Sequence, residues 1–162
     1  MRIIQTVLLP LLMFYLPLCA AAEASKEPAA VLPLLEPLKS DAIEIGEGAK
    51  DAYVFVDPKC LKSADFLDAI RENATLRKQF HYYIFLYDMP QAPSEEVINA
   101  VYTAASPKEA MFTYMLEHKR LSKETNETPA AAQERIRRIK KAAEQIGIDK
   151  TPYLIVNKRT VK

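Results

Sequence analysis

One segment constrains the fold more than any other: residues 53–63, which read YVFVDPKCLKS. Its first four residues are aromatic or β-branched, which predicts a buried strand. Asp57-Pro58 ends that strand, because proline lacks a backbone N–H and biases the residue before it away from helix. The apolar residues that follow are spaced on one face of a helix. Cys60 is therefore expected at the junction where a strand ends and a helix begins.

Cys60 is the first candidate for chemistry. At the start of a helix, unpaired backbone N–H groups and the helix dipole favour a thiolate over a thiol. Lys59 and Lys62 place positive charge nearby. This setting is typical of a reactive cysteine. The alternative interpretation is that Cys60 is only a small residue at a helix start.

The first 22 residues have the layout of a secretory signal peptide. A basic start is followed by an apolar run over 3–18 and by small residues over 19–22, which read CAAA. We therefore predict a cleaved signal peptide over 1–22 and a periplasmic or secreted protein. Two alternatives stay open. The apolar run is long enough for a membrane anchor, although its prolines make it a poor one, and residues 16–19 faintly resemble a bacterial lipoprotein box.

Cleavage after residue 22 would remove one basic residue, Arg2, and one of the two cysteines, Cys19. It leaves 21 of the 22 basic residues against 21 acidic ones, so the mature chain is formally neutral. A nucleic-acid partner is not expected, since it needs a concentrated basic face. Cys60 remains as a lone thiol. It cannot form an internal disulfide, so it is either inert or reactive toward other molecules.

The mature chain is predicted to open with a Pro- and Leu-rich arm over 23–41. Its prolines argue against a continuous regular helix, and its leucines favour packing on the domain. Residues 42–46 alternate between apolar and polar, which predicts an edge strand. The strand over 53–57 and the Cys60 helix, which ends near residue 72, precede a second buried strand over 80–88. This strand–helix–strand order predicts a right-handed unit with parallel strands.

A helical insertion is predicted over about 94–146, with breaks near Pro107 and over 125–129. The apolar stripe of its last helix is typical of core packing, and Gly147 is a suitable helix stop. A final strand over 151–157 opens with Thr151-Pro152.

In this arrangement the chain resembles the thioredoxin fold, and in particular the exported bacterial disulfide-exchange proteins of the Dsb type. The resemblance covers roughly residues 42–162. Three features carry it: the strand that leads into Cys60 at a helix start, the helical insertion, and the Gly-Ile-Asp-Lys-Thr-Pro sequence over 147–152 before a hydrophobic strand. It implies an α/β fold with a thioredoxin-like sheet. Against that family, we expect the usual last strand and covering helix to be missing and the arm to be too short for the dimerisation domain of the isomerases.

The resemblance also implies roles for four residues. Cys60 and Ser63 occupy the two cysteine positions of the family's Cys-x-x-Cys site, so this chain has a Cys-x-x-Ser variant. In the family the second cysteine resolves a mixed disulfide, which a serine cannot do, although the Ser63 hydroxyl could stabilise the Cys60 thiolate. Pro152 is expected in the cis form beside Cys60, with Thr151 pairing to extended substrate. The alternative is a trans proline that starts an edge strand.

Two functions are consistent with these residues. The first is a monothiol disulfide-exchange protein whose Cys60 forms mixed disulfides with exported protein thiols or with a small thiol. The second is a redox-inactive, thioredoxin-fold module that binds peptides or proteins. No cofactor is expected. No metal site is expected either, because His81 and His118 have no carboxylate or cysteine at metal-ligand spacing.

Overall fold

The structure, a computed structural model, describes residues 28–90, 93–121, 125 and 127–157. In these residues one sheet has the strand order β1-β3-β2-β4. β2 and β3 run parallel, and β1 and β4 pair with them in antiparallel fashion at the two edges. The predicted parallel unit and the predicted edge strand are confirmed. The strands are β1 (Ile43–Ile45), β2 (Lys50–Val56), β3 (Phe80–Leu86) and β4 (Tyr153–Val156).

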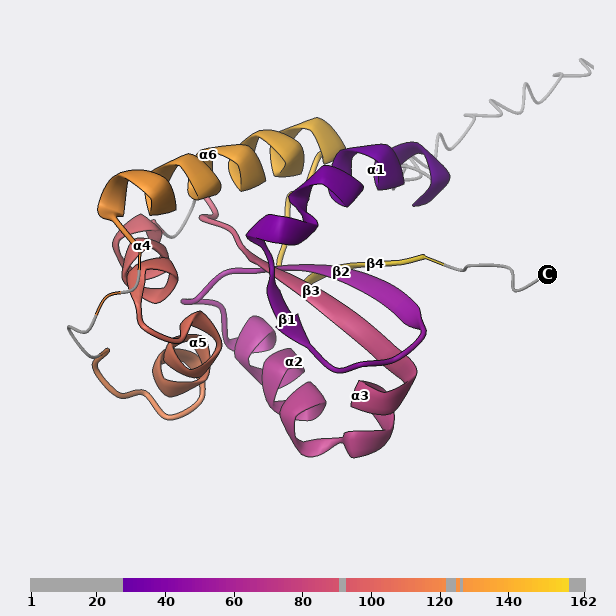
Figure 1. Cartoon of the computed structure of the whole chain (residues 1–162), viewed down its shortest axis with the longest axis horizontal. Helices are drawn as coiled ribbons and strands as arrows, with labels where there is room; N and C mark the ends of the chain where they lie inside the picture. Colours follow the sequence, from indigo (N-terminus) through magenta and orange to yellow (C-terminus); the bar gives the residue numbers. More distant parts are fainter. Residues whose placement is uncertain (1–27, 91–92, 122–124, 126, 158–162) are drawn as a thin grey trace, which may run out of the picture.

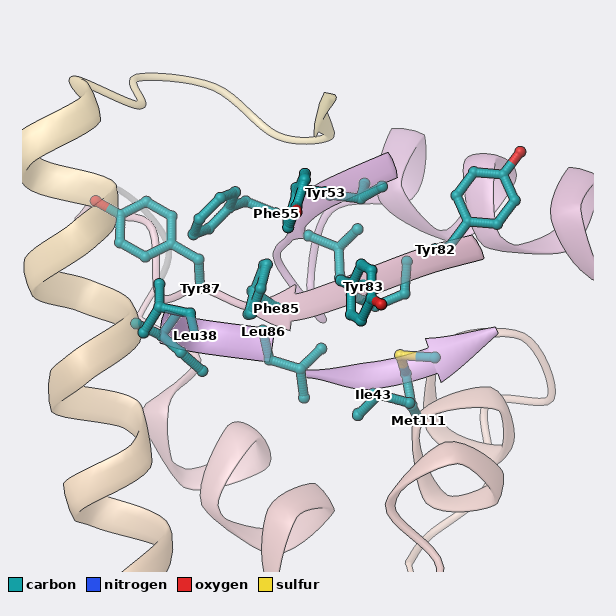
Figure 2. Packing of buried hydrophobic residues seen from close by; sticks show 14 of the residues in the cluster. Leu38, Ile43, Tyr53, Phe55, Tyr82, Tyr83, Phe85, Leu86, Tyr87 and Met111 are labelled. Atoms are coloured by element: carbon teal, nitrogen blue, oxygen red, sulfur yellow. The ribbon is translucent and has the colours of Figure 1, made fainter. Parts of the chain in front are cut away.

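The two central strands form the core because both of their faces are covered. Tyr53 lies opposite Tyr83, and Phe55 lies opposite Phe85. Their ring centroids are 5.4 and 5.0 Å apart, within the range of favourable aromatic pairs. Figure 2 shows these four rings gathered over the same face of the sheet. The central strands are therefore fixed by cross-strand aromatic pairs as well as by backbone hydrogen bonds.

Helices cover the sheet on both sides (Figure 1). One layer contains α1, η1 and α6, and the Tyr53 hydroxyl of β2 donates to the Glu36 carboxylate of η1 at 2.7 Å. The other contains α2 and α3, and Phe66 of α2 meets Tyr82 of β3 edge-on at 6.3 Å. The helical bounds are α1 (Pro28–Leu35), η1 (Glu36–Asp41), α2 (Leu61–Glu72), α3 (Ala74–Gln79), α4 (Glu95–Thr103), α5 (Pro107–Met115) and α6 (Pro129–Ile146).

The N-terminal arm corrects one prediction. The prolines were expected to prevent a regular helix, yet α1 continues through Pro33. Pro33 costs one backbone hydrogen bond in a helix this short, while Val31 and Leu35 become fully buried against the domain. The chain tightens to a 3-10 helix only at η1, which has Pro37 in its first turn. Packing of the apolar face therefore outweighs the local penalty.

Charged side chains fasten the arm to the domain. Asp41, which is 5% exposed, accepts two hydrogen bonds from the Arg138 guanidinium of α6, at 2.7 and 2.8 Å. The Lys39 ammonium lies 3.0 Å from the Asp51 carboxylate and above the Tyr83 ring. Burial lowers the pKa of Lys39, but its hydrogen bonds outweigh that effect and hold the pKa above its usual range. Lys39 is therefore charged in the folded protein.

Helix ends follow the predicted signals with one omission. Gly147 ends α6 in the left-handed conformation, at φ 84°. The short helix α3 was not expected, although Asn73 gives a start signal for it: its side chain accepts hydrogen bonds from the N–H groups of Thr75 and Leu76.

The predicted signal peptide, residues 1–22, lies outside the described residues. Among the helices that the structure describes, none has the length and apolar character needed to cross a membrane.

Candidate functional site

The turn between β2 and α2 is built around Asp57. This carboxylate is buried and accepts hydrogen bonds from the backbone N–H of Lys59 at 2.8 Å and of Met89 at 3.2 Å. The Asp57 carbonyl accepts the Cys60 N–H at 3.0 Å, and the Cys60 carbonyl accepts the Ala64 N–H at 3.1 Å. Cys60 is therefore the N-cap residue of α2, as the sequence predicts.

Ser63 lies beneath Cys60, one helical turn along α2. Its side chain is fully buried, and its Oγ accepts the backbone N–H of Asp57 at 3.3 Å. The same hydroxyl also helps to lower the pKa of the Cys60 thiol. Ser63 thus connects the end of β2 to the start of the helix.

The loop before β4 reaches the same point. β4 runs antiparallel to β2 with Tyr153 opposite Phe55, so the residues before β4 lie beside those after β2. The Thr151 carbonyl oxygen is 3.4 Å from the Cys60 Sγ. The Thr151–Pro152 peptide bond is cis. The fold therefore brings Thr151 next to Cys60 and Ser63, although Cys60 and Thr151 are 91 residues apart in the sequence. Pro152 directly follows Thr151.

The pKa of the Cys60 thiol results from opposing effects. Burial raises it, but hydrogen bonds from the Ser63 N–H, the Thr151 and Ser63 side chains and the Lys62 N–H lower it, and the net pKa lies below its ordinary value. These donors stabilise the thiolate, as expected at a helix N-terminus. The Thr151 carbonyl acts in the other direction, because it can only accept a hydrogen bond, which the neutral thiol donates and the thiolate cannot.

The charges of the neighbouring lysines contribute less to the lowered pKa of Cys60 than the sequence indicates. The Lys59 ammonium donates to the Pro93 carbonyl, in the segment before α4. The Lys62 side chain is exposed to solvent, and its contribution to the Cys60 pKa comes from its backbone N–H. The helix start therefore acts mainly through peptide groups rather than through lysine charge.

A pocket of about 330 Å³ adjoins Cys60 on the side of α5. We call it the α2–α5 pocket. Thr151 and Pro152 do not line it, so it is distinct from the proline loop. The lining residues are Pro58, Lys59, Cys60, Leu61, Ala64, Tyr114, Met115 and His118.

The two histidines lie in different places. His81 has its Nε2 2.7 Å from the Glu44 carboxylate and its ring stacked on Tyr83. His118 follows α5 with a left-handed backbone, at φ 52°, and lines the α2–α5 pocket. Within the described ranges, no group of three or more His, Cys, Asp or Glu side chains could hold a metal ion.

The outer edge of β4 is unpaired within the residues that the structure describes. The Asn157 N–H donates to the Asp51 carbonyl at 2.9 Å, and this bond shows which residues of β4 hydrogen-bond to β2. Residues 153, 155 and 157 therefore direct their backbone groups to β2, and Leu154 and Val156 direct theirs outward. This edge continues directly from Pro152.

Sequence reasoning missed the contribution of α5 to the site. Tyr114 and Met115 are spaced like core residues, and His118 lies in a charged stretch. No local pattern indicates that they meet Cys60, because the contact depends on how α5 packs against α2. The capping role of Asp57 had a usable signal, since aspartate before a turn commonly accepts backbone N–H groups.

Comparisons with known proteins identify the fold. No family model and no curated protein matches the chain. Among solved structures, ScsC of Proteus mirabilis in a compact conformation is 12% identical with a TM-score of 0.59, over 83% of this chain and 71% of that one.

Two further solved structures are similar. The thiol-disulfide exchange protein alpha-DsbA2 of Wolbachia pipientis is 14% identical with a TM-score of 0.54, over 80% of this chain and 86% of that one. The disulfide interchange protein of Neisseria gonorrhoeae is 19% identical with a TM-score of 0.53, over 72% of this chain and 79% of that one. The predicted fold class is confirmed: the chain has a thioredoxin-like α/β fold.

Proposed function

We propose that this protein is a monothiol disulfide-exchange protein of the periplasm or the secreted space. Cys60 is its nucleophile, Ser63 supports the thiolate, and Thr151 and Pro152 position an extended substrate. The partners are exported proteins with cysteine thiols or disulfides. The proposal needs no cofactor and no metal.

One observation carries the proposal: a partly exposed thiol at the start of α2 lies 3.4 Å from the Thr151 carbonyl of the loop before β4. Hydrogen-bond donors around the helix start lower the pKa of that thiol. A lowered pKa increases the thiolate fraction, and the thiolate is the attacking species. This protein shares its fold with proteins named for disulfide interchange and thiol-disulfide exchange, which supports the same chemistry.

The exchange step conserves electrons. The Cys60 thiolate attacks one sulfur of a partner disulfide, the S–S bond breaks, and the second sulfur leaves as a thiolate with the bonding pair. A Cys60–partner disulfide results. Ser63 cannot attack that disulfide, so release requires a thiol from the partner or from solution.

A redox-inactive binding module is the second candidate, and the unpaired edge of β4 favours it. That edge could pair with an extended peptide by strand addition. In that case Cys60 would have no role beyond packing at the helix start.

Incubation of the chain without residues 1–22, and so without Cys19, with a peptide disulfide tests the proposal by intact-mass measurement. We expect one covalent adduct per chain, attached at Cys60 and released by added thiol. The Cys60→Ser variant should form none. Binding of the reduced peptide by both forms, with no adduct on either, would support the binding module instead.

A further inference from the structure

The α2–α5 pocket gives the proposed exchange site a second contact surface. We propose that it holds an apolar side chain next to the reacting cysteine of a polypeptide substrate. This rests on the proposed function and narrows it: the substrate is an extended protein segment with an apolar neighbour of its cysteine, rather than a small thiol.

Position is the first argument. Cys60 lines the pocket, so any partner joined to its sulfur begins at the pocket mouth. The Thr151 carbonyl oxygen is 3.4 Å from the same sulfur, and Thr151 does not line the pocket. A polypeptide attached at Cys60 therefore has the backbone of Thr151 within reach and, separately, a cavity for one of its side chains.

The character of the walls is the second argument. Leu61 and Ala64 of α2 face Tyr114 and Met115 of α5. Leu61 is 76% exposed, and in the part of the chain that the structure describes only Leu154 is another exposed large apolar residue. Burial of such surface by a partner is favourable because it removes apolar area from water.

Size favours a side chain over a whole small-molecule thiol as the occupant. The volume of about 330 Å³ is at the lower limit of small-molecule pockets, roughly 300–1,000 Å³, and suits one or two side chains. The pocket has no acidic lining residue. The Lys59 ammonium, which could attract a carboxylate, is directed at the Pro93 carbonyl. His118 also lines the pocket, but most of the remaining wall is apolar or aromatic, which favours an apolar side chain.

Two peptides test the inference, identical except for Leu or Ser on both sides of a single cysteine. Each carries thionitrobenzoate in a mixed disulfide. The Cys60 thiolate attacks the peptide sulfur, the S–S bond breaks, and coloured thionitrobenzoate leaves with the bonding pair. Each rate is divided by the rate of the same peptide with glutathione, which removes differences in intrinsic reactivity.

We expect the wild-type protein to prefer the Leu peptide by about tenfold, the order expected for one apolar group in a pocket. Ala64→Met fills the pocket and should reduce the preference to about twofold or less. Ala105→Met is the matched control, because Ala105 lines a different pocket, beside α5 and away from Cys60. Leu61→Ser removes an exposed side chain that the fold does not need, and should also abolish the preference.

Equal normalised rates for the two peptides on the wild-type protein would overturn the inference and leave the proposed function intact. A preference that survives both Ala64→Met and Leu61→Ser would overturn it as well. Failure of the proposed function looks different: the wild-type protein would then release thionitrobenzoate from neither peptide.

Discussion

At the scale of single residues, the character of Cys60 is decided by donors that point at its sulfur. Burial and the Thr151 carbonyl both favour the neutral thiol, whereas peptide N–H groups and hydroxyls favour the thiolate. The net pKa is lowered because the start of α2 supplies several donors at once. Ser63 also has a structural task, since its Oγ accepts the Asp57 N–H.

Replacing Ser63 by Ala should therefore have two effects. The Cys60 pKa should rise, because one hydrogen bond to the thiolate is lost, and alkylation of Cys60 should then require a higher pH. The buried Asp57 N–H loses its acceptor, which should lower the free energy of unfolding by about 1–3 kcal/mol.

Ser106→Ala is the control for this change. The Ser106 side chain makes no capping hydrogen bond at the start of α5, so its loss should change stability by no more than about 0.5 kcal/mol. An unchanged alkylation profile in Ser63→Ala would show that the hydroxyl does not support the thiolate.

The sequence predicts a residue's setting when the contacts that determine it come from nearby residues. The place of Cys60 at a helix start depends on neighbours within a few residues, and the sequence predicts it. The direction of the Lys59 ammonium depends on the Pro93 carbonyl, 34 residues away, and the sequence does not show it.

At the scale of elements, the first turn of α2 sets the distance between positions 60 and 63. Residues three apart in a helix lie on the same face, and a disulfide needs Cα atoms about 4.4–6.8 Å apart. This spacing makes the two positions equivalent to a dithiol pair.

Ser63→Cys should accordingly allow an internal disulfide between positions 60 and 63 under oxidising conditions. The measurement is the count of free thiols before and after reduction. The variant should also release a bound peptide without added thiol, because the new sulfur can attack the mixed disulfide. Asp65→Cys, on another face of α2, should keep both thiols free. If Ser63→Cys also keeps both thiols free, the helix does not present these positions as described.

The arm is the second element with a distinct test. Arg138→Ala removes the two hydrogen bonds to the buried Asp41. We expect a loss of about 1–3 kcal/mol in the free energy of unfolding, measured by chemical denaturation, because a buried carboxylate loses its main partner.

Arg137→Ala is the matched control. The Arg137 side chain is 72% exposed and pairs only with Glu134 among the ion pairs that the structure describes for it, so its loss should cost about 0–0.5 kcal/mol. Equal stability of the two variants would mean that the Asp41 contact does not fasten the arm.

Elements were predictable where periodicity is strong and local. β2, β3 and α6 carry clear apolar patterns, and the sequence predicts all three. The path of α1 through Pro33 was not predictable, since it depends on the burial of Val31 and Leu35 against distant parts of the chain. The α2–α5 pocket could not be predicted either, since its walls come from helices that are distant in the sequence.

At the scale of the whole molecule, the fold gathers the site at one end of the strands of the sheet. β2 ends there, and the loop before β4 returns there because the two strands are antiparallel. α5, from the helical insertion, adds the pocket wall. Cys60 thus lies near the backbone of Thr151 and also lines the α2–α5 pocket.

The central claim is that Cys60 is a reactive thiolate, and the pH dependence of its alkylation tests this most directly. Ionisation of a thiol with a lowered pKa is complete at lower pH, so the rate should rise with pH and level off early. We predict a midpoint below about 8.5, the value of a free cysteine, and no reaction in Cys60→Ser. A midpoint at or above that value would contradict the account and favour a redox-inactive binding module.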